Sequence, residues 1–336
     1  MKALIYTGLK TLEHRDVPCP DPKPGEDLIK VMVSGICGSD MHAFLGHDNR
    51  RPAPLILGHE AAGVVTGGTN HGRRVTINPL VTCQTCDNCR AGRTNLCPQR
   101  QIISMPPREG AFAEYVTMPR ENLVTVPDSV PLEKAALAEP LACGWHGVRV
   151  GLGRTQAATN SLRGLAIGGG AIGIGAALAM QAQGVTDITL IEPNEIRRDY
   201  LHDKCSFRVI HPDALEENAL FDMVVDGVGY AATRATASQR ACPGGVIVHI
   251  GLGEDTGGLD IRRMTLQEIT FVGTYTYTAE DFRQTAAAIF EGRLGALDWA
   301  TTLPLMQGQS AFEDIRSGRA AAPKILLIPE HAGTDQ

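Results

Sequence analysis

The segment LRGLAIGGGAIGIGAALAM, residues 162 to 180, decides the fold because it joins two apolar runs through a glycine-rich turn. Gly168, Gly170 and Gly173 form the pattern G-x-G-x-x-G between a predicted strand, LRGLAI, and a predicted helix, AIGIGAALAM. In that context the glycines allow a tight turn, the approach of a pyrophosphate, and close packing of helix on strand. Free N–H groups at the helix N-terminus would bind the phosphates. The segment therefore predicts a dinucleotide-binding βαβ unit.

The next predicted strand, ITLIE, ends in Glu192, 24 residues after Gly168. A carboxylate there can accept hydrogen bonds from both adenosine-ribose hydroxyls and would repel a 2′-phosphate, which favours NAD over NADP. Arg197 and Arg198 lie just downstream and could meet such a phosphate, although a solvated helix face is the preferred interpretation. Arg197 is kept as a candidate cofactor contact. The alternative is a glycine-rich turn in another α/β sheet, with Glu192 at a solvated strand end.

The pattern of apolar runs and turn residues changes twice along the chain, which predicts its domain organisation. Residues 1–140 contain short strands separated by Pro and Gly, which is typical of an irregular, β-rich domain. Residues 141–278 alternate apolar strands with helical segments, which predicts a doubly wound parallel sheet. Residues 279–336 hold an amphipathic helix and the strand KILLIP, and the final AGTDQ is expected to fray.

Composition excludes several classes of protein. The 336 residues carry a formal net charge of −6 and no basic run, which argues against nucleic acid or an anionic membrane surface as the main partner. No apolar stretch has the length of a membrane span or a signal peptide. The cysteine count of nine is odd, which disfavours a disulfide framework and favours a reducing cytoplasm.

Four of the cysteines lie in CQTCDNCRAGRTNLC, residues 83–97, here called the four-cysteine lobe. Thiolates at the spacing C-x2-C-x2-C-x7-C can surround one Zn²⁺ tetrahedrally and leave no open position, so the predicted site is structural. An iron–sulfur cluster or two disulfides are the alternatives. The polar residues of the segment favour a surface zinc lobe. It has no aromatic residue, which argues against nucleic-acid binding. The predicted ligands are Cys83, Cys86, Cys89 and Cys97.

A second metal site is indicated by three separated motifs, GICGSDMH, LILGHEAAG and ALAEPLACG. They supply Cys37, His59, Glu60 and Glu139 as candidate ligands. Zinc held by such S, N and O ligands, with room for a substrate oxygen, would be catalytic. Singly, each residue has an ordinary interpretation as a core cysteine, a hydrogen-bonded histidine or a helix cap. Their occurrence together with the four-cysteine lobe and the glycine pattern favours the metal site.

Together with GAFAEYV, EPLACGWHGV and FDMVVDGVG, these motifs resemble the zinc-containing medium-chain dehydrogenase/reductase family, and most closely its polyol dehydrogenase branch. The resemblance covers nearly the whole chain. It implies a GroES-like catalytic domain (1–140), a Rossmann domain (141–278) and a return to the catalytic domain (279–336). It also implies two zincs, NAD, an alcohol or polyol substrate, and a homo-oligomer, with a tetramer favoured over a dimer. The strand ITFVGTYTY could extend a sheet across subunits.

The resemblance also implies roles for the metal ligands. Cys37 and His59 match catalytic zinc ligands, and Glu60 matches an acid that binds zinc in some members. Glu139 stands where many alcohol dehydrogenases have a second cysteine. Glutamate there follows the polyol-branch pattern, in which it binds zinc or holds the zinc-bound water.

The remaining residues of GICGSDMH match residues that handle the substrate proton. Ser39 matches the hydroxyl that hydrogen-bonds the substrate alcohol, Asp40 the carboxylate that orients the zinc-bound histidine, and His42 the relay to solvent. The carbon-bound hydrogen would leave as hydride to the nicotinamide. Ala43 stands where sorbitol dehydrogenases often carry an aromatic residue, which argues against sorbitol itself. Phe44, Phe112 and Arg108 are candidates for the substrate pocket, with core or surface positions as the alternative.

Two other functions compete with polyol oxidation. An amino-alcohol or threonine-type dehydrogenase would use the same motifs, so the sequence leaves this choice open. A non-catalytic nucleotide-sensing protein predicts loss of Cys37, His59 or Ser39, and all three are present.

Overall fold

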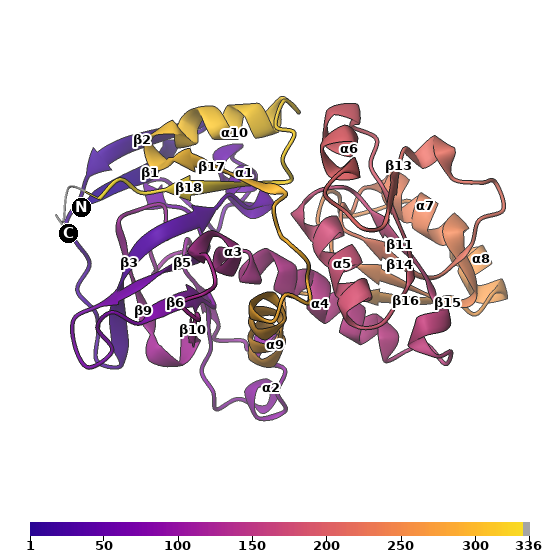
Figure 1. Ribbon diagram of the computed structural model, residues 1–336, viewed down its shortest axis with the longest axis horizontal. Helices are drawn as coiled ribbons and strands as arrows, with labels where there is room; N and C mark the ends of the chain where they lie inside the picture. Colours follow the sequence, from indigo (N-terminus) through magenta and orange to yellow (C-terminus); the bar gives the residue numbers. More distant parts are fainter. Residues whose placement is uncertain (332–336) are drawn as a thin grey trace.

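The computed structural model describes residues 1–331, so the predicted fraying of AGTDQ lies outside the described residues. Two bodies lie side by side: a β-rich one that contains the first and the last strand of residues 1–331, and an α/β one (Figure 1). No helix in residues 1–331 has the length and apolarity that crossing a membrane requires.

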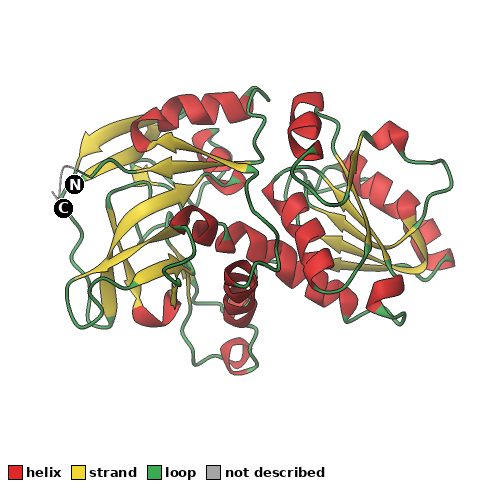
Figure 2. Ribbon diagram, viewed as in Figure 1, coloured by secondary structure: helices red, strands yellow, loops and turns green. Residues whose placement is uncertain are grey.

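The α/β body is a six-stranded parallel sheet in the order β13-β12-β11-β14-β15-β16. This order is that of a doubly wound dinucleotide-binding sheet, and the predicted fold class is confirmed. Helices cover both faces of the sheet (Figure 2). The strands are β11 (Arg163–Ile167), β12 (Asp187–Ile191), β13 (Arg208–Ile210), β14 (Phe221–Asp226), β15 (Ala241–His249) and β16 (Thr270–Gly273). The helices are α5 (Ala171–Ala182), α6 (Glu195–His202), α7 (Ala231–Arg240) and α8 (Ile261–Leu266).

The β-rich body is built around a seven-stranded sheet in the order β10-β6-β5-β3-β18-β17, with β9 also paired to β3. A second sheet has the order β2-β1-β4, and β7 pairs with β8. The N-terminal strands are β1 (Lys2–Gly8), β2 (Thr11–Asp16), β3 (Glu26–Gly35), β4 (Leu55–Ile56), β5 (Glu60–Thr66), β6 (Arg74–Ile77), β7 (Leu80–Val81), β8 (Gln101–Ile102), β9 (Tyr115–Pro119) and β10 (Leu123–Thr125). The short helices of this part are α1 (Gly38–Phe44), α2 (Asp87–Arg90) and α3 (Leu132–Ala136).

Two strands near the C-terminus belong to the β-rich body. Strand β18 (Lys324–Ile328) lies antiparallel to β3, with Leu326 opposite Gly35. Strand β17 (Ala300–Pro304) pairs in parallel with β18, and α10 (Gly308–Arg316) connects the two strands. The sequence pattern predicted neither β17 nor α10.

Helix α4 (Ala138–Leu152) joins the two bodies, because it packs on α5 of the α/β body and on α9 (Ala279–Phe290). Its buried residues belong to the largest apolar core, which includes Leu141, Trp145 and Val148. The helix runs through the predicted boundary at residue 140, and the numerical domain boundaries remain predictions.

One predicted strand is shorter than expected. ITFVGTYTY reads as a continuous strand, but β16 ends at Gly273. The chain then turns through Thr276, whose φ of +45° lies in the left-handed region. A β-branched residue costs free energy in this conformation, so local propensity could not predict the turn.

Candidate metal and cofactor sites

The glycine-rich turn has the geometry that the sequence predicted. Gly168 has a φ of +97°, and a Cβ at Gly173 would lie 1.7 Å from the carbonyl oxygen of Gly168. These two positions therefore need glycine so that α5 can pack on β11. A Cβ at Gly170 would meet nothing within 4 Å, which leaves open space at the N-terminus of α5. A pyrophosphate fits this position, where free N–H groups of the helix can bind it.

Glu192 follows β12 and supports the same turn. Its Oε2 accepts a hydrogen bond from the Gly169 N–H at 2.7 Å, and its Oε1 accepts one from the Asn194 N–H at 2.7 Å. Arg198 donates to the carbonyl oxygens of Glu192 and Pro193, and Arg197 donates to Ala320. Contacts of Glu192 and Arg197 with the cofactor remain predictions.

Cys37, His59 and Glu60 lie close together in the β-rich body. Cys37 caps α1, and His59 and Glu60 stand at the start of β5. One ligand atom from each lies within 4.8 Å of the others. Glu60 Oε1 pairs with the buried Lys324 Nζ at 2.6 Å, while Oε2 is buried and has no hydrogen-bond partner among residues 1–331. A thiolate, an imidazole and a carboxylate oxygen in need of a partner are a donor set that fits zinc.

Asp40 is fully buried and contacts the His59 ring, and its role as an orienting carboxylate remains a prediction. Its Oδ1 lies 3.4 Å from His59 Nδ1, and its Oδ2 accepts a hydrogen bond from the Cys37 N–H at 3.0 Å. Burial alone would raise the pKa of Asp40, but the neighbouring His59 and Arg51 lower it, so the carboxylate stays charged. Ser104 Oγ also lies 3.3 Å from His59 Nδ1. The other ring nitrogen, Nε2, therefore faces the cluster.

Ser39 lies beside that nitrogen, with its Oγ 3.4 Å from His59 Nε2. Arg51, which the sequence analysis did not consider, approaches the same hydroxyl with Nη2 at 3.4 Å. The guanidinium is buried between Asp48 and the carbonyl oxygen of Ser104. Arg51 lies in an irregular loop and belongs to no motif, so only the folded chain reveals it.

Two further predicted residues, Glu139 and His42, lie outside the metal-ligand group. Glu139 is buried on α4, and Tyr277 Oη donates a hydrogen bond to its Oε1 at 2.7 Å. Burial raises the pKa of Glu139 to about 7, and the neighbouring Glu60 adds to this effect. His42 is exposed on α1, next to the ring of His47. Within residues 1–331 no hydrogen bond joins His42 to Ser39.

The candidate pocket residues occupy other places. Phe44 and Phe112 are fully buried and pack against Phe312, so both belong to the core. Arg108 forms an ion pair with Glu26 at 2.9 Å. The alternative interpretation of all three, as core and surface residues, agrees with these contacts.

The four cysteines of the four-cysteine lobe converge on one point. Cys83 Sγ lies 3.5 Å from Cys97 Sγ and 3.9 Å from Cys89 Sγ. Tetrahedral zinc with Zn–S bonds of about 2.3 Å requires sulfur–sulfur distances of about 3.8 Å. Hydrogen bonds from Thr85 and the Cys86 N–H lower the pKa of Cys83 to about 6, whereas burial raises that of Cys89 to about 12. Four sulfur ligands at these distances fit a closed zinc site, in which the bound cation would displace the remaining thiol protons.

Comparison with known proteins agrees with both halves of this arrangement. Residues 23–128 match the family described as alcohol dehydrogenase GroES-like domain, and residues 171–291 match the zinc-binding dehydrogenase family. Sorbitol dehydrogenase of Bacillus subtilis is 31% identical over 352 residues, which cover 98% of this chain and 97% of that protein. The chain belongs to the zinc-containing alcohol dehydrogenase family.

Within this family the relatives place it in the polyol branch. L-galactonate-5-dehydrogenase of Escherichia coli is 30% identical and covers 88% of this chain, which covers 89% of that relative. Among solved structures, a zinc-binding dehydrogenase from Sinorhizobium meliloti bound to NADP is 27% identical. Its TM-score is 0.87, and the likeness covers 98% of this chain and 99% of that one. The predicted family, fold class, zinc and nicotinamide cofactor are thereby confirmed.

Proposed function

We propose that this zinc-containing alcohol dehydrogenase oxidises a secondary hydroxyl group of a polyol, with NAD as the hydride acceptor. The observation that carries the proposal is the group of Cys37, His59 and Glu60, in which one buried carboxylate oxygen has no hydrogen-bond partner in the described part of the chain. Zinc bound there would act as a Lewis acid that favours loss of the alcohol proton. NAD would be held by the glycine-rich turn and by Glu192.

The chain's own residues would then orient the groups and move the proton. Asp40 fixes the His59 ring, so the metal-binding nitrogen keeps one direction. Ser39 Oγ takes the alcohol proton while its own hydroxyl proton moves on toward solvent, so the serine stays neutral. The Arg51 guanidinium approaches the same oxygen and orients the hydroxyl. We infer that His42, exposed on the same helix as Ser39, passes the proton to solvent.

The experiment that tests this function follows NADH absorbance during incubation with a panel of polyols, aldonates and amino alcohols. We expect turnover with several polyols and weak turnover with mono-alcohols of matched chain length. Preferred oxidation of amino alcohols would instead support the threonine-type alternative. No NADH formation with any alcohol, in a protein that contains zinc, would contradict the proposal.

We also propose that the protein is a homotetramer in the cytoplasm. Strand β16 is the last strand of its sheet within residues 1–331, and its outer edge is unpaired there. Leu252, Ile261 and Leu266 lie in the segments just before it and are more than half exposed, which is typical of an interface between copies. Within residues 1–331 no disulfide joins any two cysteines, which suits a reducing compartment. Light scattering after size exclusion measures the mass, and cell fractionation measures the location.

A further inference from the structure

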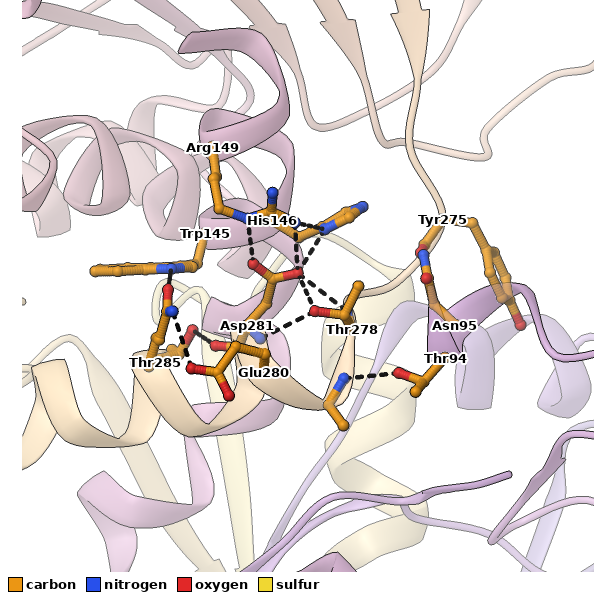
Figure 3. Close-up of polar contacts among 12 residues, drawn as sticks. Thr94, Asn95, Trp145, His146, Arg149, Tyr275, Thr278, Glu280, Asp281 and Thr285 are labelled. Atoms are coloured by element: carbon orange, nitrogen blue, oxygen red, sulfur yellow. Dashed lines mark hydrogen bonds and ion pairs between the residues drawn. The ribbon is translucent and has the colours of Figure 1, made fainter. Parts of the chain in front are cut away.

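The turn between β16 and α9 contacts the four-cysteine lobe, although the two segments are about 180 residues apart in sequence (Figure 3). Asn95 Nδ2 donates a hydrogen bond to the carbonyl oxygen of Tyr275 at 2.8 Å, and the Ala279 N–H donates to Thr94 Oγ1 at 2.8 Å. Arg100 lies over the Tyr275 ring at 4.9 Å. The lobe thus holds both ends of the turn.

The same turn is tied to helix α4. Thr278 and Asp281 form a capping box at the start of α9. Asp281 accepts a hydrogen bond from His146 at 2.7 Å and one from Arg149 Nε at 2.6 Å, and both donors lie on α4 (Figure 3). Helix α4 also carries Glu139, two turns earlier. The turn and Glu139 are therefore fixed relative to each other.

Tyr277, in the middle of the turn, reaches Glu139 directly. Its side chain is 1% exposed, and its hydroxyl hydrogen bond to Glu139 is the one side-chain hydrogen bond that Glu139 receives within residues 1–331. The preceding residue, Thr276, has the strained φ of +45°. Such strain persists only where the surrounding contacts determine the conformation. Here those contacts come from the four-cysteine lobe and from α4.

We propose that Tyr277 is a positioning residue that directs the Glu139 carboxylate toward the Cys37–His59–Glu60 group, and that the four-cysteine lobe fixes Tyr277 through Thr94 and Asn95. This inference rests on the proposed function, because it assigns a role at the same metal site. The loop of the four-cysteine lobe would then set the direction of the buried Glu139 carboxylate through Tyr277. Loss of the lobe metal would weaken metal binding at the distant site.

The test uses the full-length protein with Co²⁺ bound in place of the catalytic metal, because cobalt absorbs visible light according to its ligands and geometry. Tyr277→Phe removes only the hydroxyl and keeps the ring. We expect it to weaken Co²⁺ affinity on the order of 10- to 100-fold and to alter the absorption bands. The metal of the four-cysteine lobe, measured by elemental analysis, should be retained.

Asn95→Ala tests the link to the lobe, and Asn88→Ala is its matched control. Both side-chain amides donate to a backbone carbonyl, but Asn88 bonds to Leu96 within the lobe and does not reach the turn. We expect Asn95→Ala to weaken Co²⁺ affinity about 2- to 10-fold, as loss of a neutral hydrogen bond does. Asn88→Ala should leave it at the wild-type value.

A double variant, Tyr277→Phe with Glu139→Gln, tests whether the tyrosine acts through Glu139. The two effects on Co²⁺ affinity should then be less than additive. Wild-type affinity and absorption in Tyr277→Phe would overturn the positioning role. Equal losses in Asn95→Ala and Asn88→Ala would overturn the specific link to the turn. Either result leaves the proposed function intact, whereas a wild-type protein without metal at Cys37 and His59 would remove the function itself.

Discussion

Glu192 serves two purposes with a single carboxylate, since it already supports the Gly169 N–H and is predicted to bind the adenosine ribose. Glu192→Ala removes charge-assisted hydrogen bonds to that ribose. We therefore expect NADH binding to weaken by on the order of 1.5–3 kcal/mol, and the discrimination against NADPH to relax. Fluorescence titration with both cofactors measures this. Glu195→Ala, at an exposed position of α6, is the control. A wild-type preference for NADPH would show that Arg197 and Arg198 dominate.

A second single-residue variant, His42→Ala, tests the proposed proton pathway. His42→Ala should slow alcohol oxidation near neutral pH, toward the low end of the roughly 10²- to 10⁴-fold range for positioned acid–base groups. Water can partly replace the imidazole, so the loss should shrink at alkaline pH, and external imidazole should restore some turnover. His47→Ala, which removes the neighbouring exposed ring, should have little effect. Parallel pH profiles for wild type and His42→Ala would assign the relay elsewhere.

At the scale of the elements, the start of α9 is stabilised by one buried carboxylate. Burial alone would raise the pKa of Asp281, but hydrogen bonds from His146, Arg149 and Thr278 hold it well below its usual range. Asp281→Asn should lower the free energy of unfolding by on the order of 2 kcal/mol near neutral pH. Asp314→Asn removes a charge from an exposed ion pair and should cost less than about 1 kcal/mol.

The pH dependence of this stability has a fixed sign. The folded-state pKa of Asp281 lies below the unfolded value of about 4. Its stabilisation is therefore fully present above about pH 4 and is lost as the pH falls through the folded-state pKa. Urea unfolding from pH 3 to pH 7 should show the difference between wild type and Asp281→Asn shrinking at the acidic end. A constant difference across this range would contradict the assignment.

The elements show which parts of the fold local sequence can predict. The strand–turn–helix at residues 162–180 followed from glycine spacing and apolar runs, because sterics within one segment determine it. The end of β16 could not be predicted from local sequence, because the left-handed Thr276 lies in a turn that is held by the distant Asn95. The sequence motifs predicted Cys37 and His59 as candidate metal ligands. Arg51 could not be predicted as a site residue, because only the folded loop brings it to Ser39.

At the scale of the whole molecule, the two metal sites differ in access. The four-cysteine lobe offers a closed tetrahedral set, whereas the Cys37–His59–Glu60 group leaves room for another ligand. Mild chelation should therefore remove the catalytic zinc first, leaving about one zinc per chain and no NADH formation. Cys19→Ser, at an exposed cysteine outside both groups, should keep two zincs. Iron with visible absorption, or no zinc at all, would contradict the assignment.

The position of β18 between β3 and β17 of the seven-stranded sheet also sets an order of events during synthesis. Lys324, whose ammonium group pairs with the Glu60 carboxylate, lies 264 residues after it in sequence. The lysine is therefore synthesised long after the glutamate. The α/β body is one contiguous stretch and can fold while the chain is still being made. In the seven-stranded sheet, β17 cannot connect to β3 until β18, which lies between them, has emerged from the ribosome. We expect the nascent chain to bind the cofactor before it binds its catalytic metal, so that the enzyme becomes active only after β18 has left the ribosome.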